Sequence, residues 1–251
     1  MVVTDSFVAA IDGSTSKSNV QLHPDMRNGQ YAMMLICQYT KTIPSDITCK
    51  DFCEGVTSVF QETYQENGIS LKELKENPVE RLTASAIVYS KNRKEIWMIG
   101  DCQCLVDGVH HDNEKPAEAV NAMKRSRYIH EKLKQGANVS DFQTHDTGRE
   151  YILHDIIDSC KSQNITYAVI DGFPVFMGGV KVISVKNCHE IVLATDGYPR
   201  LLPTLSESEE WLQRTLESDP LCIDIHVATK AVMKGNNSFD DRTYIRFTDT
   251  E

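Results

Sequence analysis

The sequence predicts an α+β fold built from largely antiparallel sheets, with helices that cover the sheet faces. Many apolar runs of strand length follow one another through short turns, which is typical of antiparallel pairing. The predicted helices come in blocks between groups of strands, whereas βαβ units would place one helix after each strand. The chain of 251 residues contains no internal repeat, low-complexity tract or linker rich in Pro, Gly and Ser, so we expect one domain over residues 1–251.

The first half of the chain begins with strands and one helix. Residues 6–12 and 31–39 are apolar runs, which we interpret as a hairpin with a long polar loop. Asp46 is a suitable N-cap for a helix over residues 47–67, which Asn67-Gly68 would end. Further apolar runs predict strands over 82–90 and 94–101, followed by a third strand that turns at Asp107-Gly108.

The second half predicts helices on either side of another group of strands. Pro116 at a helix-entry position and Gln135-Gly136 at the other end predict a helix over 116–136. Further helices are predicted over 147–163, over 207–218 with a capping box of Ser206, Glu209 and Glu210, and over 220–234. Strands are predicted over residues 165–170, 175–185, 190–195 and 242–248.

Charge and hydropathy argue against several classes of partner. The formal net charge of −10 is unfavourable for binding nucleic acid or an anionic membrane. A phosphorylated substrate remains compatible with it, because bound divalent cations reverse the local sign. No apolar run reaches the roughly 20 residues that cross a bilayer. The N-terminal segment has no basic leader and carries Asp5 and Asp12, so we expect a cytoplasmic protein without a signal peptide.

The eight cysteines are expected to be thiols, because cytoplasmic proteins keep cysteine reduced. Cys102 and Cys104 would share one face of a strand, and Cys49 and Cys53 are spaced i, i+4 on a predicted helix. A zinc site is the alternative, but no other ligand follows zinc-finger spacing. We therefore interpret these cysteines as small buried hydrophobic residues.

Acidic residues beside predicted strands are the strongest functional signal. Asp5 and Asp12-Gly13 lie near the start, Asp196-Gly197 follows a later apolar run, and Asp240-Asp241 precedes the last strand. Carboxylates at strand ends are held rigidly, and several in one place repel one another unless a cation joins them. Oxygen ligands without nearby His or Cys suit Mg²⁺ or Mn²⁺ better than zinc. Each member alone is also compatible with a strand-end turn or a solvated loop.

Two further Asp-Gly pairs have a different context. Asp107-Gly108 and Asp171-Gly172 lie between apolar runs at hairpin spacing. A tight turn in which Gly supplies a positive φ is the favoured interpretation for both.

Five segments in a defined order resemble one known family. The chain contains TDSFVAAIDG, TASAIVY, IWMIGDCQCLVDG, IVLATDG and DDRT, which together span about residues 4–247. This order resembles the PPM (PP2C-type) metal-dependent protein serine/threonine phosphatases, in a divergent, bacterial-like form. The resemblance implies a four-layer αββα sandwich, in which two mainly antiparallel sheets pack together between helices.

The resemblance also implies a centre of two Mn²⁺ or Mg²⁺ ions. Carried over by position, Asp12 bridges both ions, Gly13 offers its main-chain carbonyl, and Asp196 and Asp240 complete the shell of the second ion. Asp5 stands for the second acid of the family's early acidic pair and is a further expected ligand. Asp12, Asp196 and Asp240 would act through a metal-bound water that supplies hydroxide for in-line attack on phosphorus. The implied substrate is a phosphoserine or phosphothreonine protein.

Other positions of the resemblance have no single interpretation. Asp101, in the Gly-Asp signature, is either a ligand or a strand-end turn residue, and Asp241 and Thr243 more readily orient the final loop. The basic run Lys124-Arg125-Ser126-Arg127 is either a substrate flap or a helix face, and we favour the helix face.

Three departures from the family pattern leave other functions open. Thr4 replaces the first acid of the early pair, and Ser14-Thr15-Ser16 replaces the usual His-Gly-Gly. The upstream phosphate-binding arginine has no equivalent, for which Lys17, Arg27 and Arg200 are candidate substitutes. The alternative is therefore a catalytically degraded regulatory or binding module of the same fold. A third hypothesis, an N-terminal-nucleophile hydrolase, would require cleavage after Val3 to expose Thr4.

Overall fold

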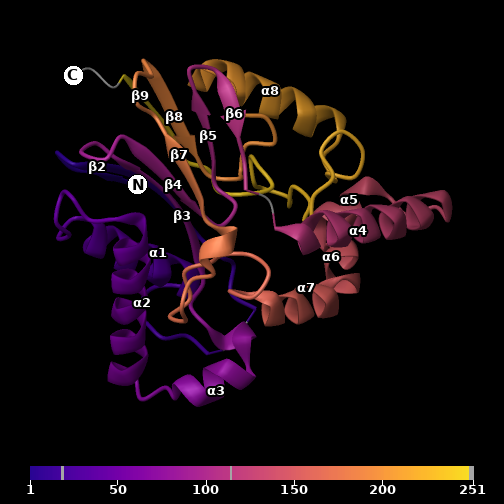
Figure 1. The fold of residues 1–251 in the computed structure, drawn as a ribbon. Helices are drawn as coiled ribbons and strands as arrows, with labels where there is room; N and C mark the ends of the chain where they lie inside the picture. The colour runs from indigo at the N-terminus through magenta and orange to yellow at the C-terminus, as the bar shows by residue number, and fades with distance from the viewer. Residues whose placement is uncertain (18–19, 114, 249–251) are drawn as a thin grey trace. The chain divides into compact units, whose positions relative to one another are not determined.

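The computed structural model describes residues 1–17, 20–113 and 115–248, and the chain forms two compact units (Figure 1). The first unit comprises residues 1–113, 160–195 and the segment from 243 onward. The second comprises residues 114–159 and 196–242. The expected single domain over 1–251 stays a prediction.

The first unit contains two antiparallel sheets. One has five strands, in the order β1 (Val2–Val3), β2 (Phe7–Gly13), β3 (Ala84–Ser90), β4 (Glu95–Ile99) and β7 (Lys181–Ser184). The other has four, in the order β6 (Val109–His111), β5 (Gln103–Val106), β8 (Glu190–Ala194) and β9 (Tyr244–Thr248). Every pairing is antiparallel, so the predicted α+β class with two antiparallel sheets is confirmed.

The two faces of the first sheet bury different sets of apolar side chains. On β3, Ala86 and Val88 pack into a core with α1 (Asn28–Thr40) and α2 (Cys49–Glu66). Ile87 and Tyr89 point the other way, into a core shared with the second sheet. This alternation follows from the two-residue repeat of strand side chains. The unit therefore has three layers, which are helices, first sheet and second sheet, and the predicted fourth layer stays a prediction.

Residues 31–39 lie inside α1, so the predicted strand there is wrong. The buried residues Ala32, Leu35, Ile36 and Thr40 recur at helical spacing, and Met, Leu, Gln and Ala also favour helices. The run is apolar on most sides, which hides the helical period from a simple count. As a consequence, β2 pairs with β1 and β3 and has no hairpin partner at 31–39.

The predicted helix over 47–67 is confirmed as α2, although its cap differs. Thr48 is the N-cap, and its Oγ1 accepts a hydrogen bond from the main-chain nitrogen of Asp51 at 3.1 Å. The helix ends at Asn67, and Gly68 follows with a φ of 70°. The first unit also contains the short helix α3 (Leu71–Glu76) and three 3₁₀ turns, η1 (Pro78–Glu80), η2 (Cys160–Ser162) and η3 (Met177–Gly179).

The second unit is helical and is organised around a buried arginine. Its helices are α4 (Pro116–Lys134), α5 (Val139–Thr144), α6 (Thr147–Tyr151), α7 (Leu153–Ser159) and α8 (Leu205–Ser218). On α4, Arg125 is fully buried, and its Nη2 lies 2.8 Å from Asp146 Oδ2. The basic run is thus part of a helix, but Arg125 and Ser126 point inward and only Lys124 and Arg127 are exposed.

The second unit contradicts the predicted helix over 220–234, because this segment is irregular. The carboxylate of Asp219 accepts hydrogen bonds from the main-chain nitrogens of Ile223, Asp224 and Ile225, at 3.0, 2.8 and 2.8 Å. Arg125 Nη1 donates to the carbonyl of Leu221 at 2.9 Å. Side chains that hydrogen-bond to nearby main-chain groups compete with helix formation. Here the buried carboxylate of Asp219 and the buried guanidinium of Arg125 bind the main-chain groups that a helix would pair.

The remaining elements agree with the sequence in part. Strands β8 and β9 confirm the predictions over 190–195 and 242–248, whereas residues 165–170 form only isolated bridges. The predicted helix over 147–163 is divided into α6, α7 and η2. The capping box of α8 is Thr204 with Glu207, two residues before the Ser206, Glu209 and Glu210 expected. Among the described residues, no helix combines the length and hydropathy that crossing a bilayer requires.

Candidate functional site

In the first unit, the end of β2 brings Asp12 beside Ser85 on the neighbouring strand. Asp12 is the direct cross-strand partner of Ser85 on β3, so the two side chains lie on the same face of the sheet. Ser85 Oγ in turn donates to Asp101 Oδ1 at 2.5 Å. Ser85 is thus the cross-strand neighbour of Asp12 and the hydrogen-bond partner of Asp101, where β2 ends beside the start of β3.

Two glycines make this arrangement possible by allowing close approach. A Cβ on Gly100 would lie 2.2 Å from Ser85 Oγ, so only glycine lets Asp101 come so near to β3. A Cβ on Gly13 would lie 2.0 Å from the carbonyl oxygen of Gly29, in the first turn of α1. The residue after Asp12 is thus packed directly against the start of α1, which holds the end of β2 in place.

The second sheet ends at the same part of the first unit. Gln103, two residues after Asp101, donates through Nε2 to the carbonyl of Thr195 at 3.1 Å. Thr195 Oγ1 accepts a hydrogen bond from the main-chain nitrogen of Thr243 at 2.9 Å. Asp196 follows Thr195 directly in the chain, and Thr243 comes three residues after Asp240.

In the second unit, the segments that carry Asp196 and Asp240 pack directly against one another. A Cβ on Gly197 would lie 2.3 Å from the carbonyl oxygen of Asp241. The Asp-Gly signature and the Asp-Asp signature, more than forty residues apart in the chain, therefore meet through their backbones. This unit brings two of the expected ligand segments together.

A hydrogen-bonded triad supports that meeting point. Arg242 donates from Nε and Nη2 to the two carboxylate oxygens of Glu209, each at 2.7 Å. Tyr198 donates its hydroxyl to the same carboxylate at 2.6 Å. The Arg242 hydrogen bonds lower the pKa of Glu209, while burial raises the pKa of Tyr198. The triad ties the residues after Asp196-Gly197 and Asp240-Asp241 to α8.

Asp240 has a lysine as its immediate partner. Lys230 Nζ lies 2.5 Å from Asp240 Oδ2, and the side chains are 24% and 25% exposed. The other carboxylate oxygen accepts a hydrogen bond from the main-chain nitrogen of Asp241 at 2.9 Å. A positive charge is therefore already in contact with this expected metal ligand.

Asp5 is not brought to the other acids. It lies in the turn between β1 and β2, where Thr4 Oγ1 accepts a hydrogen bond from the main-chain nitrogen of Phe7 at 2.9 Å. Asp12 is near the opposite end of β2, and the strand from Phe7 to Asp12 alone spans about 17 Å at roughly 3.3 Å per residue. An exposed acid at that distance cannot share an ion with Asp12, so Asp5 is left out of the ligand set below.

The other two Asp-Gly pairs are turns, as their context predicts. Asp107 and Gly108 connect β5 and β6 with φ values of 47° and 81°. Asp171 is buried, and its carboxylate pairs with Arg81 Nη1 at 2.9 Å. Both carboxylates are thereby used to hold loops.

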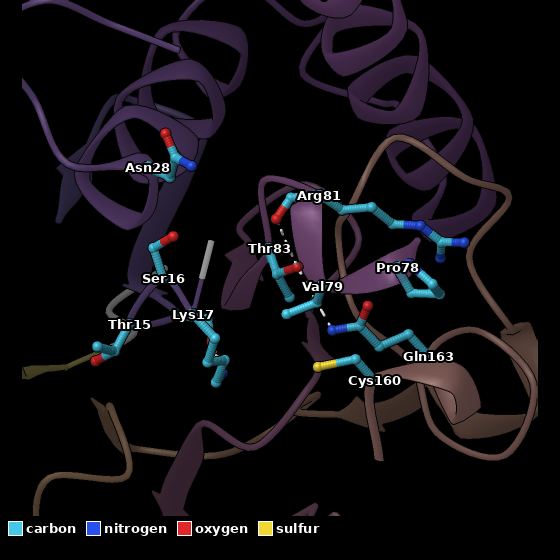
Figure 2. Close-up of a pocket in the computed structure, with 11 residues that line it drawn as sticks. Thr15, Ser16, Lys17, Asn28, Pro78, Val79, Arg81, Thr83, Cys160 and Gln163 are labelled. Carbon is cyan, nitrogen blue, oxygen red and sulfur yellow. Dashed lines mark hydrogen bonds between the residues drawn. The ribbon is translucent and has the colours of Figure 1, made fainter. Parts of the chain in front are cut away.

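A small pocket lies next to the end of β2 in the first unit (Figure 2). Ser14, Thr15, Ser16 and Lys17 face Thr83, Cys160 and Gln163 across it, with room for about one water-sized group. Lys17 Nζ donates to Ser14 Oγ at 3.2 Å, and Ser14 in turn donates its main-chain nitrogen to Thr83 at 2.9 Å. Arg81 also lines the pocket, but its guanidinium is directed away from it, toward Asp171. The pocket is polar, and Lys17 brings a positive charge to it.

The residue types present fit a hard divalent cation. Asp12, Asp101, Asp196 and Asp240 offer carboxylate oxygens without a competing thiolate or imidazole, as Mg²⁺ and Mn²⁺ prefer. Within residues 1–17, 20–113 and 115–248, no three or more His, Cys, Asp or Glu side chains are arranged to hold a metal ion. Asp12 and Asp101 lie in the first unit, and Asp196 and Asp240 lie in the second.

Several of these residues carried no signal in the sequence. The sequence predicts a strand at Ser85, a capping box at Glu209 and a helix at Lys230. Their importance comes from partners that are distant in the chain, such as Asp101, Arg242 and Asp240. Lys17 was noted as one of three candidate cations. Of the other two, Arg27 is exposed at the start of α1 and Arg200 is exposed in the second unit.

Comparison with known proteins finds similarity only among solved structures. No protein-family model matches the sequence, and no curated protein sequence matches it significantly. A bacterial serine phosphatase is 11% identical with a TM-score of 0.42, over 96% of this chain and 97% of that chain. The serine/threonine phosphatase Stp1 from Staphylococcus aureus is also 11% identical with a TM-score of 0.42, over 100% and 98%. The catalytic domain of the phosphatase PstP, solved with two manganese ions, is 9% identical with a TM-score of 0.33, over 83% and 85%.

Proposed function

We propose that this chain is a metal-dependent phosphomonoester hydrolase acting on phosphoserine or phosphothreonine in proteins. The observation that carries the proposal is the end of β2, where Asp12 lies across from Ser85, Ser85 is hydrogen-bonded to Asp101, and the polar pocket begins at Ser14. The packing of Gly197 against Asp241 supports it, because it brings together two further segments with the expected acids. The order of the acidic signatures in the sequence agrees with the same activity.

In this proposal, Asp12, Gly13, Asp196 and Asp240 hold two Mn²⁺ or Mg²⁺ ions, and Asp101 supports them. When bound, such ions supply a hydroxide near neutral pH and offset the negative charge of a phosphoryl group. The chain's own contribution is to fix the carboxylates before the substrate arrives. Ser85 orients Asp101, Gly13 is held by α1, and the Glu209–Arg242 pair holds the segment after Asp240.

The pocket next to the end of β2 has room for one phosphoryl oxygen. Lys17 supplies a positive charge, and the hydroxyls of Thr15, Ser16 and Thr83 can each donate a hydrogen bond. In this proposal, Lys17 is the cation that binds the phosphoryl oxygen. Because this loop follows Gly13 directly in the chain, a group bound there would lie next to the proposed ions.

The decisive test is the hydrolysis of p-nitrophenyl phosphate and of a phosphothreonine peptide with and without Mn²⁺. Asp12→Ala is expected to lower kcat at least about 100-fold, because removal of a direct ligand costs more than the 10- to 100-fold loss typical of its supporting residues. Asp25→Ala, which removes an exposed acid in the loop before α1, is the matched control and should keep full activity. Equal activity of Asp12→Ala and the parent protein, with unchanged circular dichroism, would contradict the proposal.

The ion pair between Lys230 and Asp240 favours a second candidate, a regulatory or binding module of the same fold. A lysine that permanently neutralises Asp240 would make a metal unnecessary for stability there. Calorimetric titration with Mn²⁺ separates the two functions, because the hydrolase must bind the ion and the module need not. Thr4, which the N-terminal-nucleophile hypothesis requires, is engaged in the turn before β2, and no observation favours that hypothesis.

A further inference from the structure

We propose that Lys230 is a built-in competitor of the divalent cation for Asp240, which sets how much Mn²⁺ or Mg²⁺ the site requires. This inference rests on the proposed function and concerns the control of that same site. Lys230 is a positioning and charge-balancing residue in this scheme, and it takes no part in the reaction itself.

Both oxygens of the Asp240 carboxylate are occupied. Oδ2 is in contact with Lys230 Nζ at 2.5 Å, and Oδ1 accepts a hydrogen bond from the main-chain nitrogen of Asp241 at 2.9 Å. Arg149 adds a second positive charge that interacts with Asp240 at longer range. A cation that approaches this carboxylate must displace the ammonium group or remain beside it, and either process weakens binding.

The lysine is held at this position by its neighbours in the chain. Thr229, immediately before it, accepts a hydrogen bond at its carbonyl from Arg149 Nη1 at 3.1 Å. Ala231, immediately after it, donates its main-chain nitrogen to Asp146 Oδ2 at 2.9 Å. Asp146 is the partner of the fully buried Arg125. The backbone of Lys230 is therefore anchored on both sides, so its proximity to Asp240 is built into the second unit.

The partner side is anchored as well. Phe239, before Asp240, packs its ring against that of His226, with centroids 4.9 Å apart. Asp241, after it, meets Gly197 through its carbonyl oxygen. Because both side chains are about three-quarters buried, the pair is screened less by salt than a surface pair, and the competition persists at physiological ionic strength.

The test compares Mn²⁺ binding to three proteins by isothermal titration calorimetry, without any substrate. Lys230→Met keeps the length of the side chain and removes the charge, and Lys234→Met does the same at an exposed lysine four residues away. We expect Lys230→Met to bind Mn²⁺ roughly three- to tenfold more tightly than the parent chain, which is the effect of a partly buried ion pair. Lys234→Met should bind as the parent chain does.

Two further variants make the result specific. Lys230→Arg retains a positive charge and is expected to keep the affinity of the parent chain. In an Asp240→Asn background, Lys230→Met should no longer improve binding, because the contested carboxylate is gone. Thermal melting of each variant shows whether it is folded.

The possible outcomes separate the two proposals. If the parent chain binds Mn²⁺ and Lys230→Met binds equally or more weakly, the competition is refuted while the proposed function stands. If neither protein binds Mn²⁺, the proposed function fails and the competition fails with it. If Lys230→Met binds Mn²⁺ more tightly than both the parent chain and Lys234→Met, the competition is supported. The same holds if Lys230→Met binds Mn²⁺ and the parent chain does not bind it at all.

Discussion

Four Asp-Gly pairs share one sequence signature, yet their neighbours give them different roles. Asp171 is buried against Arg81, and Asp107 accepts main-chain hydrogen bonds from His189 and Glu190, each at 2.9 Å. Asp12 instead lies across from Ser85 at a strand end, and Ser85 is hydrogen-bonded to Asp101. The chemistry of a carboxylate therefore depends on its surroundings. A carboxylate that is hydrogen-bonded to a guanidinium or to two main-chain amides binds a cation less readily.

The Glu209–Arg242 pair gives a pH-dependent prediction. Arg242 lowers the pKa of Glu209 below its usual value of 4.5, so the pair stabilises the fold above that pH and loses its effect as the pH falls through the lowered value. Arg242→Met is expected to reduce the free energy of unfolding by about 1 kcal/mol at pH 7, a modest figure because the Glu209 side chain is 32% exposed. Urea denaturation at pH 7 and near pH 3 measures the difference, which should shrink in acid.

Arg200→Met, at an exposed arginine two residues after Tyr198, is the control for this measurement. It should change the free energy of unfolding by less than about 0.5 kcal/mol at both pH values. An effect of Arg242→Met that is the same at pH 7 and pH 3 would show that Glu209 is not its energetic partner.

The candidate site depends on one contact between secondary-structure elements, where the end of β2 packs against the start of α1. Gly13 and Gly29 meet backbone to backbone, with no room for a side chain on either. The side chains of α1 fill the core on the helix-covered face of the first sheet, so this contact sets where the strand end lies relative to the helix. Asp12 is the residue before Gly13 and moves with it.

Gly13→Ala tests this contact. The added methyl group would approach the Gly29 carbonyl oxygen to 2.0 Å, and a packed backbone atom cannot give way cheaply. We expect a loss of about 3 kcal/mol in the free energy of unfolding, together with weaker Mn²⁺ binding. Gly136→Ala is the matched control, because that glycine has a φ of 98° but open space around it, so it should cost only about 1 kcal/mol. A smaller loss for Gly13→Ala than for Gly136→Ala would disprove the packing argument.

At the scale of the whole molecule, the cysteines belong to the cores of both units. All eight are thiols, and seven of them are buried, while Cys37 on α1 is partly exposed. Cys102, Cys104 and Cys188 pack in the core between the two sheets, and Cys49 and Cys53 pack in the core under α2. The interpretation of the cysteines as small hydrophobic residues agrees with these positions.

Alkylation of the native protein should reflect this distribution. Burial raises the pKa of Cys104 and of Cys222 to about 12, so both remain protonated and unreactive at pH 8. Iodoacetamide at pH 8 is expected to label Cys37 first, and labelling in denaturant should reach all eight thiols. Intact-mass spectrometry counts the labels. Rapid labelling at Cys104 in the native protein, or fewer than eight labels after unfolding, would contradict the structure.

Local patterns were sufficient for most of the fold. The strands from Ala84 to Ile99, the turn at Asp107-Gly108 and the helix from Pro116 follow from apolar periodicity and turn residues that act over a few positions. The same reasoning identified Asp12-Gly13 and Asp196-Gly197 as strand-end acids. It failed at residues 31–39, where an almost uniformly apolar run hides the helical period, and at 220–234, where buried charges replace helical hydrogen bonds.

The contacts between residues that are distant in the sequence were determined by the tertiary structure alone. Residue type and local spacing are properties of neighbouring positions, so they established the strand and helix content, the oxygen-only character of the acidic signatures and the resemblance to a phosphatase family. Contacts between Ser85 and Asp101, Gly13 and Gly29, and Lys230 and Asp240 join residues that are 10 or more positions apart. They arise only when packing brings distant segments together, and they decide which carboxylates are exposed to a cation and which are already neutralised.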